Sequence, residues 1–317
     1  MTVGDFIQVA QRRLEAAGIG SARLDVLVLV EDQLGHDRAW VLAHPEYELT
    51  ASDKNVLDEQ FGRRVSHEPL AHLRGHSEFY GRKFVVSAAV LQPRPESEAM
   101  IEALKKIVSD WPSGVRLMPG AAASKHHGIN ASAHHTHASK QQDAMMQTQK
   151  IQKGLRIADV GAGSGALGIT AQLELPEASV DLLEIDEAAL AVARANVINH
   201  TTGQKVIKSD LLAQSPQDYD ILLCNLPYVP DDYQINRAAK FEPRIALFGG
   251  PDGLNIFRQL FAQLQIVEKK PLYILIEAFP DQHAAISHLA SGESGLGYRV
   301  IATDGFIVVL AARPMND

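Results

Sequence analysis

The sequence predicts an α/β protein that carries a small helical bundle at its amino-terminal end. Its 317 residues are about twice the length of a typical domain, and 46% of them are hydrophobic, which is enough apolar surface to offset the entropy of an ordered chain. Apolar residues recur at helical spacing as far as Val65, and after Lys153 short strands alternate with helices. Such alternation favours a mostly parallel, Rossmann-like, seven-stranded sheet with helices on both faces.

Residues 1–74 are expected to form the helical domain. The apolar positions that define its helical period are Phe6, Val9, Ala10, Leu14, Leu24, Leu27, Val28, Val30, Val56, Leu57 and Phe61. Ser21, Asp37 and Ser52 occupy positions typical of N-caps, because their short polar side chains accept hydrogen bonds from the first free amides of a helix. A bundle of short helices follows.

Residues 75–110 are expected to link this bundle to the sheet. The segment from Glu78 to Val86 indicates two short strands that turn at Gly81, and Pro95 is well placed to start a helix that ends near Val108.

Residues 111–153 have no periodicity and are rich in Ala, Ser, Gln and His, which predicts a flexible insertion. Its clustered histidines are His126, His127, His134, His135 and His137. Because no carboxylate or thiolate partners are ordered beside them, we expect a solvated tract and no metal site.

Residues 154–317 are expected to form the α/β domain. The predicted strands are Leu155–Val160, Ser179–Glu184, Lys205–Lys208, Tyr219–Cys224 and Leu272–Glu277, with helices from Ser164, from Asp186 and over Leu254–Val267. The segment from Tyr298 to Ala311 predicts a terminal antiparallel hairpin that turns at Asp304-Gly305, since Asp-Gly favours positive φ.

Composition also limits the compartment and the partners. The single cysteine, Cys224, cannot form an internal disulfide, and the start, Met1 to Gln11, lacks the basic and apolar segments of a signal peptide. The formal net charge of −8 disfavours a sequence-independent grip on nucleic acid, which depends on Lys and Arg. We therefore expect a cytoplasmic, monomeric protein with no membrane segment and no stable nucleic-acid partner.

A glycine-rich turn between the first strand of this domain and the following helix predicts a nucleotide-type ligand. The turn consists of Asp159, Val160, Gly161, Ala162, Gly163, Ser164 and Gly165. Its glycines permit positive φ and let a ligand approach the backbone closely. The same pattern satisfies the dinucleotide fingerprint, so the turn does not by itself identify the ligand.

Acidic residues favour S-adenosylmethionine over a dinucleotide as that ligand. The carboxylate of Asp159 suits a cationic ligand and repels a pyrophosphate, and Glu184 ends the next strand, where it can accept hydrogen bonds from ribose hydroxyls. Asp186 is interpreted as the cap of the following helix. Asp210 is placed to meet an adenine amino group, with Leu211 packed on the ring.

Asn225-Leu226-Pro227-Tyr228 follows the fourth strand, at the edge where open α/β sheets bind ligands. A planar amide or aniline-like nitrogen is a poor nucleophile and must be held in line with a methyl group. The side-chain oxygen of Asn225 and the carbonyl of Leu226 are expected to accept one hydrogen each from an NH2 group. Pro227 stiffens the turn, and Tyr228 is expected to pack on the planar group.

Several motifs resemble the HemK/PrmC-type N5-glutamine methyltransferases that modify peptide-chain release factors. Glu68 to Gly81 looks like the linker hairpin of that family, Pro93 to Glu98 looks like its PRPETE element, and Phe241 to Gly253 is similar to the stretch after its acceptor motif. The resemblance implies a release factor as partner, the glutamine of its Gly-Gly-Gln loop as substrate, and a helical domain at residues 1–74 that contacts it.

Two other functions stay open from the sequence alone. The family motif is usually Asn-Pro-Pro-Tyr, whereas Asn-Leu-Pro-Tyr, with Leu226 second, resembles the form in rRNA adenine dimethyltransferases. The other alternative is a module that binds the cofactor without turnover, which the long insertion and the Leu226 change would permit.

Overall fold

A computed structural model describes residues 1–111, 153–215, 217–293 and 295–312. Of the insertion predicted for residues 111–153, only Trp111 and Lys153 belong to the described residues, so the prediction of a flexible His-rich segment lies outside them. None of the helices in the described part of the chain has the length and apolar character that a bilayer crossing requires.

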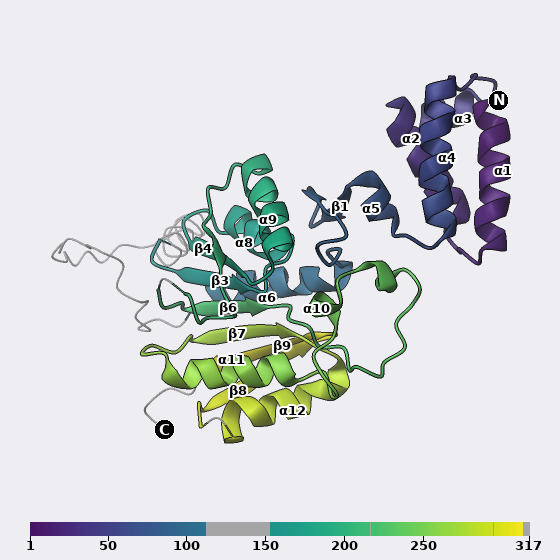
Figure 1. The fold of residues 1–317 in the computed structure, drawn as a ribbon. Helices are drawn as coiled ribbons and strands as arrows, with labels where there is room; N and C mark the ends of the chain where they lie inside the picture. Colours follow the sequence, from purple (N-terminus) through teal and green to yellow (C-terminus); the bar gives the residue numbers. More distant parts are fainter. Residues whose placement is uncertain (112–152, 216, 294, 313–317) are drawn as a thin grey trace, which may run out of the picture.

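The amino-terminal helices form a bundle that stands apart from the sheet (Figure 1). They are α1 (Val3–Ala16), α2 (Ala22–Leu34), α3 (Arg38–Ala43) and α4 (Ala51–Val65), followed by the short α5 (Leu70–Arg74). The core of the bundle includes Phe6, Leu14, Val30 and Leu57. Three positions of the predicted apolar period point outward instead, because Val9, Leu24 and Val56 are exposed.

The predicted N-caps of the bundle are correct in part. Asp37 caps α3, where its carboxylate accepts the amide hydrogen of Trp40 at 2.8 Å. Ser21 stands at the N-cap of α2, although its side chain makes no capping hydrogen bond. The prediction of Ser52 was wrong: Thr50 caps α4, because it forms a capping box with Asp53 three residues later.

The predicted linker joins the bundle to the sheet through a hairpin. Its strands are β1 (His76–Phe79) and β2 (Arg82–Val85), which pair antiparallel. Pro95 begins one 3-10 turn, η1 (Pro95–Ser97), and α6 (Glu98–Ser109) continues from it. The helix predicted to start at Pro95 is therefore confirmed, with a tighter first turn.

The predicted seven-stranded sheet is confirmed. Its strands are β3 (Arg156–Val160), β4 (Ser179–Glu184), β5 (Val206–Lys208), β6 (Ile221–Cys224), β7 (Tyr273–Glu277), β8 (Tyr298–Asp304) and β9 (Ile307–Ala312). They lie in the order β5-β4-β3-β6-β7-β9-β8, with β3 to β7 parallel and β9 antiparallel to both of its neighbours. The turn of the last hairpin lies one residue later than predicted, because Asp304 still pairs with Ile307.

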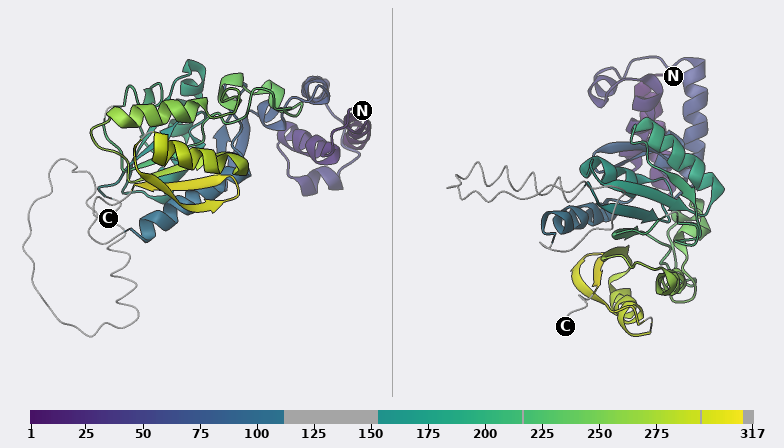
Figure 2. Two further views of the ribbon diagram at one scale, coloured as in Figure 1. Left: turned by 90° about the horizontal axis from the view of Figure 1, so that it is seen from below. Right: turned by 90° about the vertical axis from the view of Figure 1, so that its left-hand side faces the viewer.

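Helices cover both faces of this sheet (Figure 2). The helices of the α/β domain are α8 (Ala166–Glu174), α9 (Glu187–Asn199), α10 (Arg244–Leu247), α11 (Asn255–Ile266) and α12 (His283–His288), with the short turns η2 (Ala239–Phe241), η3 (Pro280–Gln282) and η4 (Leu289–Glu293). One core layer joins α6, α8 and α9 to one face, and a second joins α11 and α12 to the other. Successive side chains along each buried strand point to opposite faces of the sheet, so alternate residues pack into one core layer or the other.

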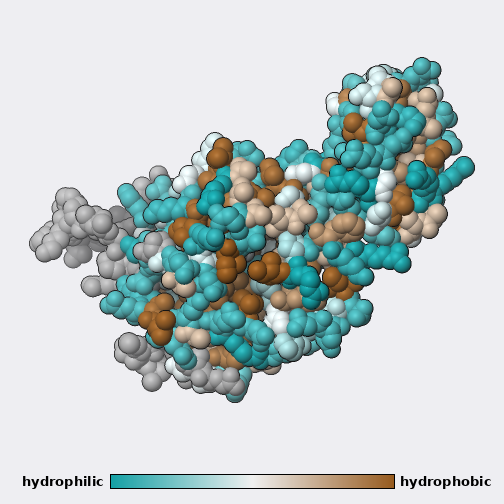
Figure 3. All heavy atoms as spheres, viewed as in Figure 1, coloured by the Kyte–Doolittle hydropathy of each residue, from teal (hydrophilic) through white to brown (hydrophobic). Residues whose placement is uncertain are grey.

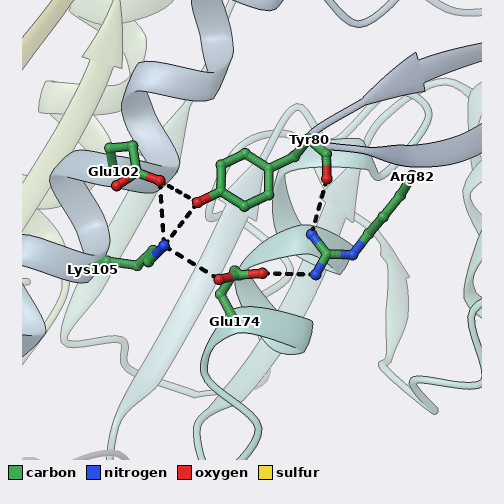
Figure 4. Close-up of polar contacts among 5 residues, drawn as sticks. All are labelled: Tyr80, Arg82, Glu102, Lys105 and Glu174. Carbon is green, nitrogen blue, oxygen red and sulfur yellow. Dashed lines mark hydrogen bonds and ion pairs between the residues drawn. The ribbon is translucent and has the colours of Figure 1, made fainter.

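A polar network fixes the linker hairpin to α6 and to α8 (Figure 4). The ammonium of Lys105 on α6 donates to the Tyr80 hydroxyl at 2.8 Å and pairs with Glu174 on α8 at 3.4 Å. Arg82 pairs with Glu174 at 2.7 Å, and Tyr80 also donates to Glu102. An isolated surface ion pair contributes about 1 kcal/mol or less to the stability of a protein. These residues share partners with one another, so the hairpin is held by the network as a whole and not by one pair.

Asn196 on α9 connects the same hairpin to the glycine turn after β3. Its side chain is fully buried, accepts the amide hydrogen of Val85 at 2.7 Å and donates to the carbonyls of Val85 and Ser164, both at 2.9 Å. One side chain thus satisfies three backbone groups from two distant segments.

We predict that Asn196→Ala lowers the free energy of unfolding by roughly 2–4 kcal/mol, because it leaves buried backbone groups without partners at about 1–3 kcal/mol each. Urea denaturation measures the change. The exposed Asn199 lies one turn further along α9, so Asn199→Ala is the matched control and should be nearly neutral. Equal stability of the two variants would contradict the role given to Asn196.

Candidate functional site

A cavity of about 310 Å³ opens at the carboxyl ends of β3, β4 and β6. The strand order changes direction at β3, which is where open α/β sheets bind ligands. Hydrophobic side chains gather on this face of the domain amid a mostly hydrophilic surface (Figure 3). Of the predicted site residues, those that line the cavity are Asp159, Gly161, Ala162, Gly163, Ser164, Glu184, Asp210, Leu211, Asn225, Leu226 and Pro227.

The glycine turn has the backbone conformation that its sequence predicts. Gly161 and Gly163 have φ of 71° and 55°, in the left-handed region that favours glycine. A side chain at Gly161 would come within 2.8 Å of the Leu226 methyl group. Gly165 does not line the cavity; it caps α8 and packs against Ile169 and Leu182.

Asp159 is buried at the floor of the cavity. Its carboxylate accepts the amide hydrogen of Gly168, in the first turn of α8, at 2.8 Å. Burial, together with the nearby charge of Glu184, raises the pKa of Asp159 to about 7, against the hydrogen bond from Gly168, which lowers it. A cationic ligand beside this carboxyl would favour its ionised form.

Glu184 holds the glycine turn against the end of β4. One carboxylate oxygen accepts the amide hydrogen of Gly163 at 2.8 Å, and the other accepts those of Ile185 and Asp186 at 2.8 and 2.9 Å. A carboxylate has about four acceptor positions, so one stays available for a ligand hydroxyl. Asp186 caps α9 through the amide of Ala189, as predicted.

The cavity is acidic at its polar wall and apolar elsewhere. Asp159, Glu184, Asp186 and Asp210 line it, and among its described lining residues none is Lys, Arg or His. Such a wall repels a pyrophosphate and suits a cation. The buried Leu211 and the exposed Ile245 supply apolar surface for a planar ring. The residues present therefore fit a cationic nucleoside such as S-adenosylmethionine.

Asn225, Leu226 and Pro227 enter the cavity from the loop after β6. The amide nitrogen of Asn225 donates to the Ser97 hydroxyl oxygen at 3.1 Å. Because that contact uses the NH2 end, the side-chain oxygen of Asn225 stays available as an acceptor. Tyr228 does not line the cavity: its hydroxyl donates to Glu277 at 3.0 Å, and its ring packs edge-on against Phe279.

Ser97 and Glu277 are site residues that the sequence interpretation missed. The Ser97 hydroxyl lies beside Asn225 and donates to Glu277 at 2.5 Å. Glu277 ends the apolar strand β7 in the same way that Glu184 ends β4, and this strand-end acid was the available signal. Ser97 has no comparable local signal.

The segment after the acceptor tetrapeptide packs directly against it. The Val229 amide donates to the Leu247 carbonyl, and the Gly249 amide donates to the Val229 carbonyl, within a short parallel bridge, Val229↔Phe248. A side chain at Gly249 would come within 2.3 Å of the Pro227 carbonyl oxygen, and one at Gly253 within 2.0 Å of the Tyr228 carbonyl oxygen. These close approaches explain why the Gly-Gly-Pro-Asp-Gly sequence accompanies the tetrapeptide.

Two of the family-like motifs meet in an ion pair. Arg94 donates to both carboxylate oxygens of Glu242, at 2.8 and 2.6 Å, and the Gln92 amide donates to the same group. Burial raises the pKa of Glu242, which Arg94 opposes. The pair thus ties the segment before α6 to the segment after the acceptor loop.

Cys224 is a buried strand residue, as predicted, and burial raises the pKa of its thiol well above the ordinary value. A protonated thiol is a poor nucleophile, so a covalent role for Cys224 has no support.

Two family models match the chain. The model for the PrmC N-terminal domain matches residues 5–75, and the model for the methyltransferase small domain matches residues 125–240.

Three relatives named release factor glutamine methyltransferase match over most of their length. The release factor glutamine methyltransferase of Koribacter versatilis is 33% identical over 83% of this chain and 81% of the relative. That of Moorella thermoacetica is 30% identical over 92% and 90%, and that of Coxiella burnetii is 29% identical over 88% and 86%. The chain is thus similar to whole proteins of one activity.

We predict that Asp159→Asn stabilises the ligand-free protein as the pH rises. The unfolded carboxyl ionises near its ordinary pKa of 3.8 and the folded one only near 7, so wild-type stability falls between these pH values. The variant lacks this titration, while its side-chain oxygen still accepts from Gly168. Its advantage should grow from pH 5 to pH 8, by at most about 3 kcal/mol.

Urea denaturation at the two pH values measures this difference. The exposed Asp58 on α4 does not line the cavity and offers the control Asp58→Asn, which measures the effect of neutralising a surface carboxylate. An advantage of Asp159→Asn that stays constant between pH 5 and pH 8 would show that Asp159 ionises normally in the folded protein.

Proposed function

The chain belongs to the release factor glutamine methyltransferase family, and we propose that the loop after β6 holds the amide group of the substrate glutamine. The protein transfers a methyl group from S-adenosylmethionine to the side-chain amide nitrogen, N5, of a glutamine in a peptide-chain release factor. Family membership decides against the two alternatives that the sequence left open, an rRNA adenine methyltransferase and an inactive binding module.

The glycine turn and the strand-end acids are proposed to hold the methyl donor. Bound S-adenosylmethionine supplies an electrophilic methyl group on a positively charged sulfur. Asp159 would face that positive charge, and Glu184 would accept hydrogen bonds from the ribose hydroxyls. Leu211 would pack against the adenine ring, with Asp210 near its amino group. The acidic, lysine- and arginine-free lining of the described cavity supports this assignment.

One contact supports the proposed acceptor site above all others: the NH2 end of the Asn225 amide donates to Ser97. The side-chain oxygen of Asn225 then accepts one hydrogen of the substrate NH2 group, and the carbonyl of Leu226 accepts the second. The two acceptors form hydrogen bonds with both N–H groups, which raises the electron density on the substrate nitrogen. They also hold the lone pair of that nitrogen in line with the methyl group.

Leu226, which replaces the usual proline, keeps this role because only its carbonyl is required. Its buried side chain packs against Gly161 and so couples the acceptor loop to the glycine turn. Pro227 would fix the backbone next to that carbonyl. For Tyr228 we propose support through Glu277 in place of the predicted packing on the substrate amide, because its hydroxyl already donates there.

We further propose that the substrate glutamine lies in the Gly-Gly-Gln motif of the release factor, that residues 1–74 contact this partner, and that the protein acts as a cytoplasmic monomer without a stable nucleic-acid partner. The net charge of −8 supports the last point.

The transfer reaction tests the assigned substrate. With radiolabelled S-adenosylmethionine we expect label on a purified release factor, and no label on the same factor after its Gly-Gly-Gln glutamine is changed to alanine. Parallel reactions contain rRNA or no acceptor. Label on rRNA alone would overturn the assignment, and label that survives the glutamine change would place the methyl group elsewhere on the factor.

We predict that Asn225→Ala lowers kcat by about a hundredfold or more, a loss comparable with removal of one directed hydrogen-bonding group from an active site. Affinity for S-adenosylmethionine should stay within about twofold of the wild-type value, because the variant keeps the glycine turn and Glu184. A twofold change in affinity corresponds to less than about 0.5 kcal/mol of binding free energy. Single-turnover kinetics and calorimetry measure the two quantities. The exposed Asn199 gives the control Asn199→Ala. Wild-type turnover by Asn225→Ala would refute the acceptor role.

A further inference from the structure

Glu277 is a buried carboxylate behind Asn225, and the proposed transfer does not yet use it. It is 2% exposed and stands at the end of β7. One of its oxygens accepts from the Ser97 hydroxyl at 2.5 Å, and the other accepts from the Tyr228 hydroxyl at 3.0 Å. Burial of a charge is unfavourable unless hydrogen bonds compensate it, so the position of Glu277 calls for a physical reason.

The direction of these hydrogen bonds determines how the Asn225 amide is turned. An ionised carboxylate only accepts, so the single proton of the Ser97 hydroxyl points to Glu277. The Ser97 oxygen is then left with acceptor positions toward Asn225. The group that faces it must be a donor, which is the NH2 end of the amide. The side-chain oxygen of Asn225 lies at the other corner of the planar amide.

We propose that Glu277 and Ser97 are positioning residues that fix which end of the Asn225 amide faces the substrate. The two ends of an amide are nearly equal in shape, so packing alone distinguishes them poorly. The relay from Glu277 through Ser97 distinguishes them by hydrogen-bond polarity. This inference rests on the acceptor role proposed for Asn225, because only an acceptor at that position needs a defined orientation.

Loss of the negative charge removes this polarity. If Glu277 gains a proton or becomes glutamine, it can donate to the Ser97 oxygen. The Ser97 proton is then free to point at the oxygen of Asn225. In that arrangement the amide turns over, and its NH2 group meets the NH2 group of the substrate. Two donors that face one another cannot hold the substrate nitrogen in line.

The surroundings of Glu277 set the pH at which this happens. Burial raises the pKa of Glu277, and the charge of Glu96 on η1 raises it further. Hydrogen bonds from Ser97 and Tyr228, and the nearby amide of Asn225, act in the opposite direction. The net shift is upward, so protonation of Glu277 and the accompanying loss of kcat should occur at a higher pH than for an ordinary glutamate.

The experiment compares Glu277→Gln, Ser97→Ala and the double variant in the full-length protein with a release factor as substrate. Each single change should lower kcat about tenfold, while KM for the release factor and affinity for S-adenosylmethionine change less than about threefold. The double variant should be no slower than the slower single variant, because both changes interrupt one relay. The acid-side loss of kcat that is assigned to Glu277 should be absent from Glu277→Gln.

Asp181 provides a matched control for the cost of neutralising a buried carboxylate. It lies in β4 of the same sheet, is 3% exposed, and accepts a tyrosine hydroxyl, that of Tyr219, at 3.0 Å. It does not line the cavity. Asp181→Asn should therefore change thermal stability without the tenfold loss of kcat. An equal loss of kcat in Asp181→Asn and Glu277→Gln would overturn the inference.

Further outcomes separate this inference from the function on which it rests. Wild-type kcat in Glu277→Gln and Ser97→Ala, together with an inactive Asn225→Ala, would overturn the inference alone. An active Asn225→Ala would overturn the acceptor role and the inference with it. If Glu277→Gln does not fold, Ser97→Ala decides, because it removes the relay and leaves the charge at position 277 in place.

Discussion

The parallel pairing of β3, β4, β6 and β7 determines where the chemistry of this protein takes place. The carboxyl ends of parallel strands meet at one edge of a sheet, so the groups that follow them are brought together whatever their separation in the chain. The glycine turn follows β3, Glu184 ends β4, Asn225 follows β6 and Glu277 ends β7. The proposed donor cavity and the proposed acceptor loop therefore lie at the same edge of the sheet. The groups of the cavity come from the ends of β3 and β4, and those of the acceptor site come from the ends of β6 and β7.

Buried carboxylates recur at this edge, and each has a different set of partners. Asp159 accepts one backbone hydrogen and keeps a raised pKa, which suits a site that receives a cation. Glu184 accepts three backbone hydrogens and so shapes the glycine turn. Glu277 accepts two hydroxyls and orients the acceptor amide. The carboxylate group thus serves charge complementarity, loop geometry and orientation, because hydrogen-bond partners decide what a buried charge does.

The segments that resemble family motifs pack together around the acceptor loop. The Arg94–Glu242 pair joins the segment before α6 to the segment after the loop, and Gly249 and Gly253 let that second segment lie against the backbone of Pro227 and Tyr228. Asn196 and the Tyr80 network fix the linker hairpin, whose Phe79 lines the cavity, to the helices behind it. Rigid support of this kind is what an in-line transfer to a weak nucleophile requires.

The sequence by itself determined the order of helices and strands, the glycine turn, the strand-end acid Glu184 and the acceptor tetrapeptide at Asn225, because each leaves a local signal in periodicity, glycine spacing or position after a strand. Only the tertiary structure decided what holds these groups. Ser97 and Asn225 are 128 residues apart, and Ser97 and Glu277 are 180 apart. A hydrogen bond across such a distance leaves no pattern in a single sequence, since it depends on how the sheet stacks its strands and on which donor finds which acceptor.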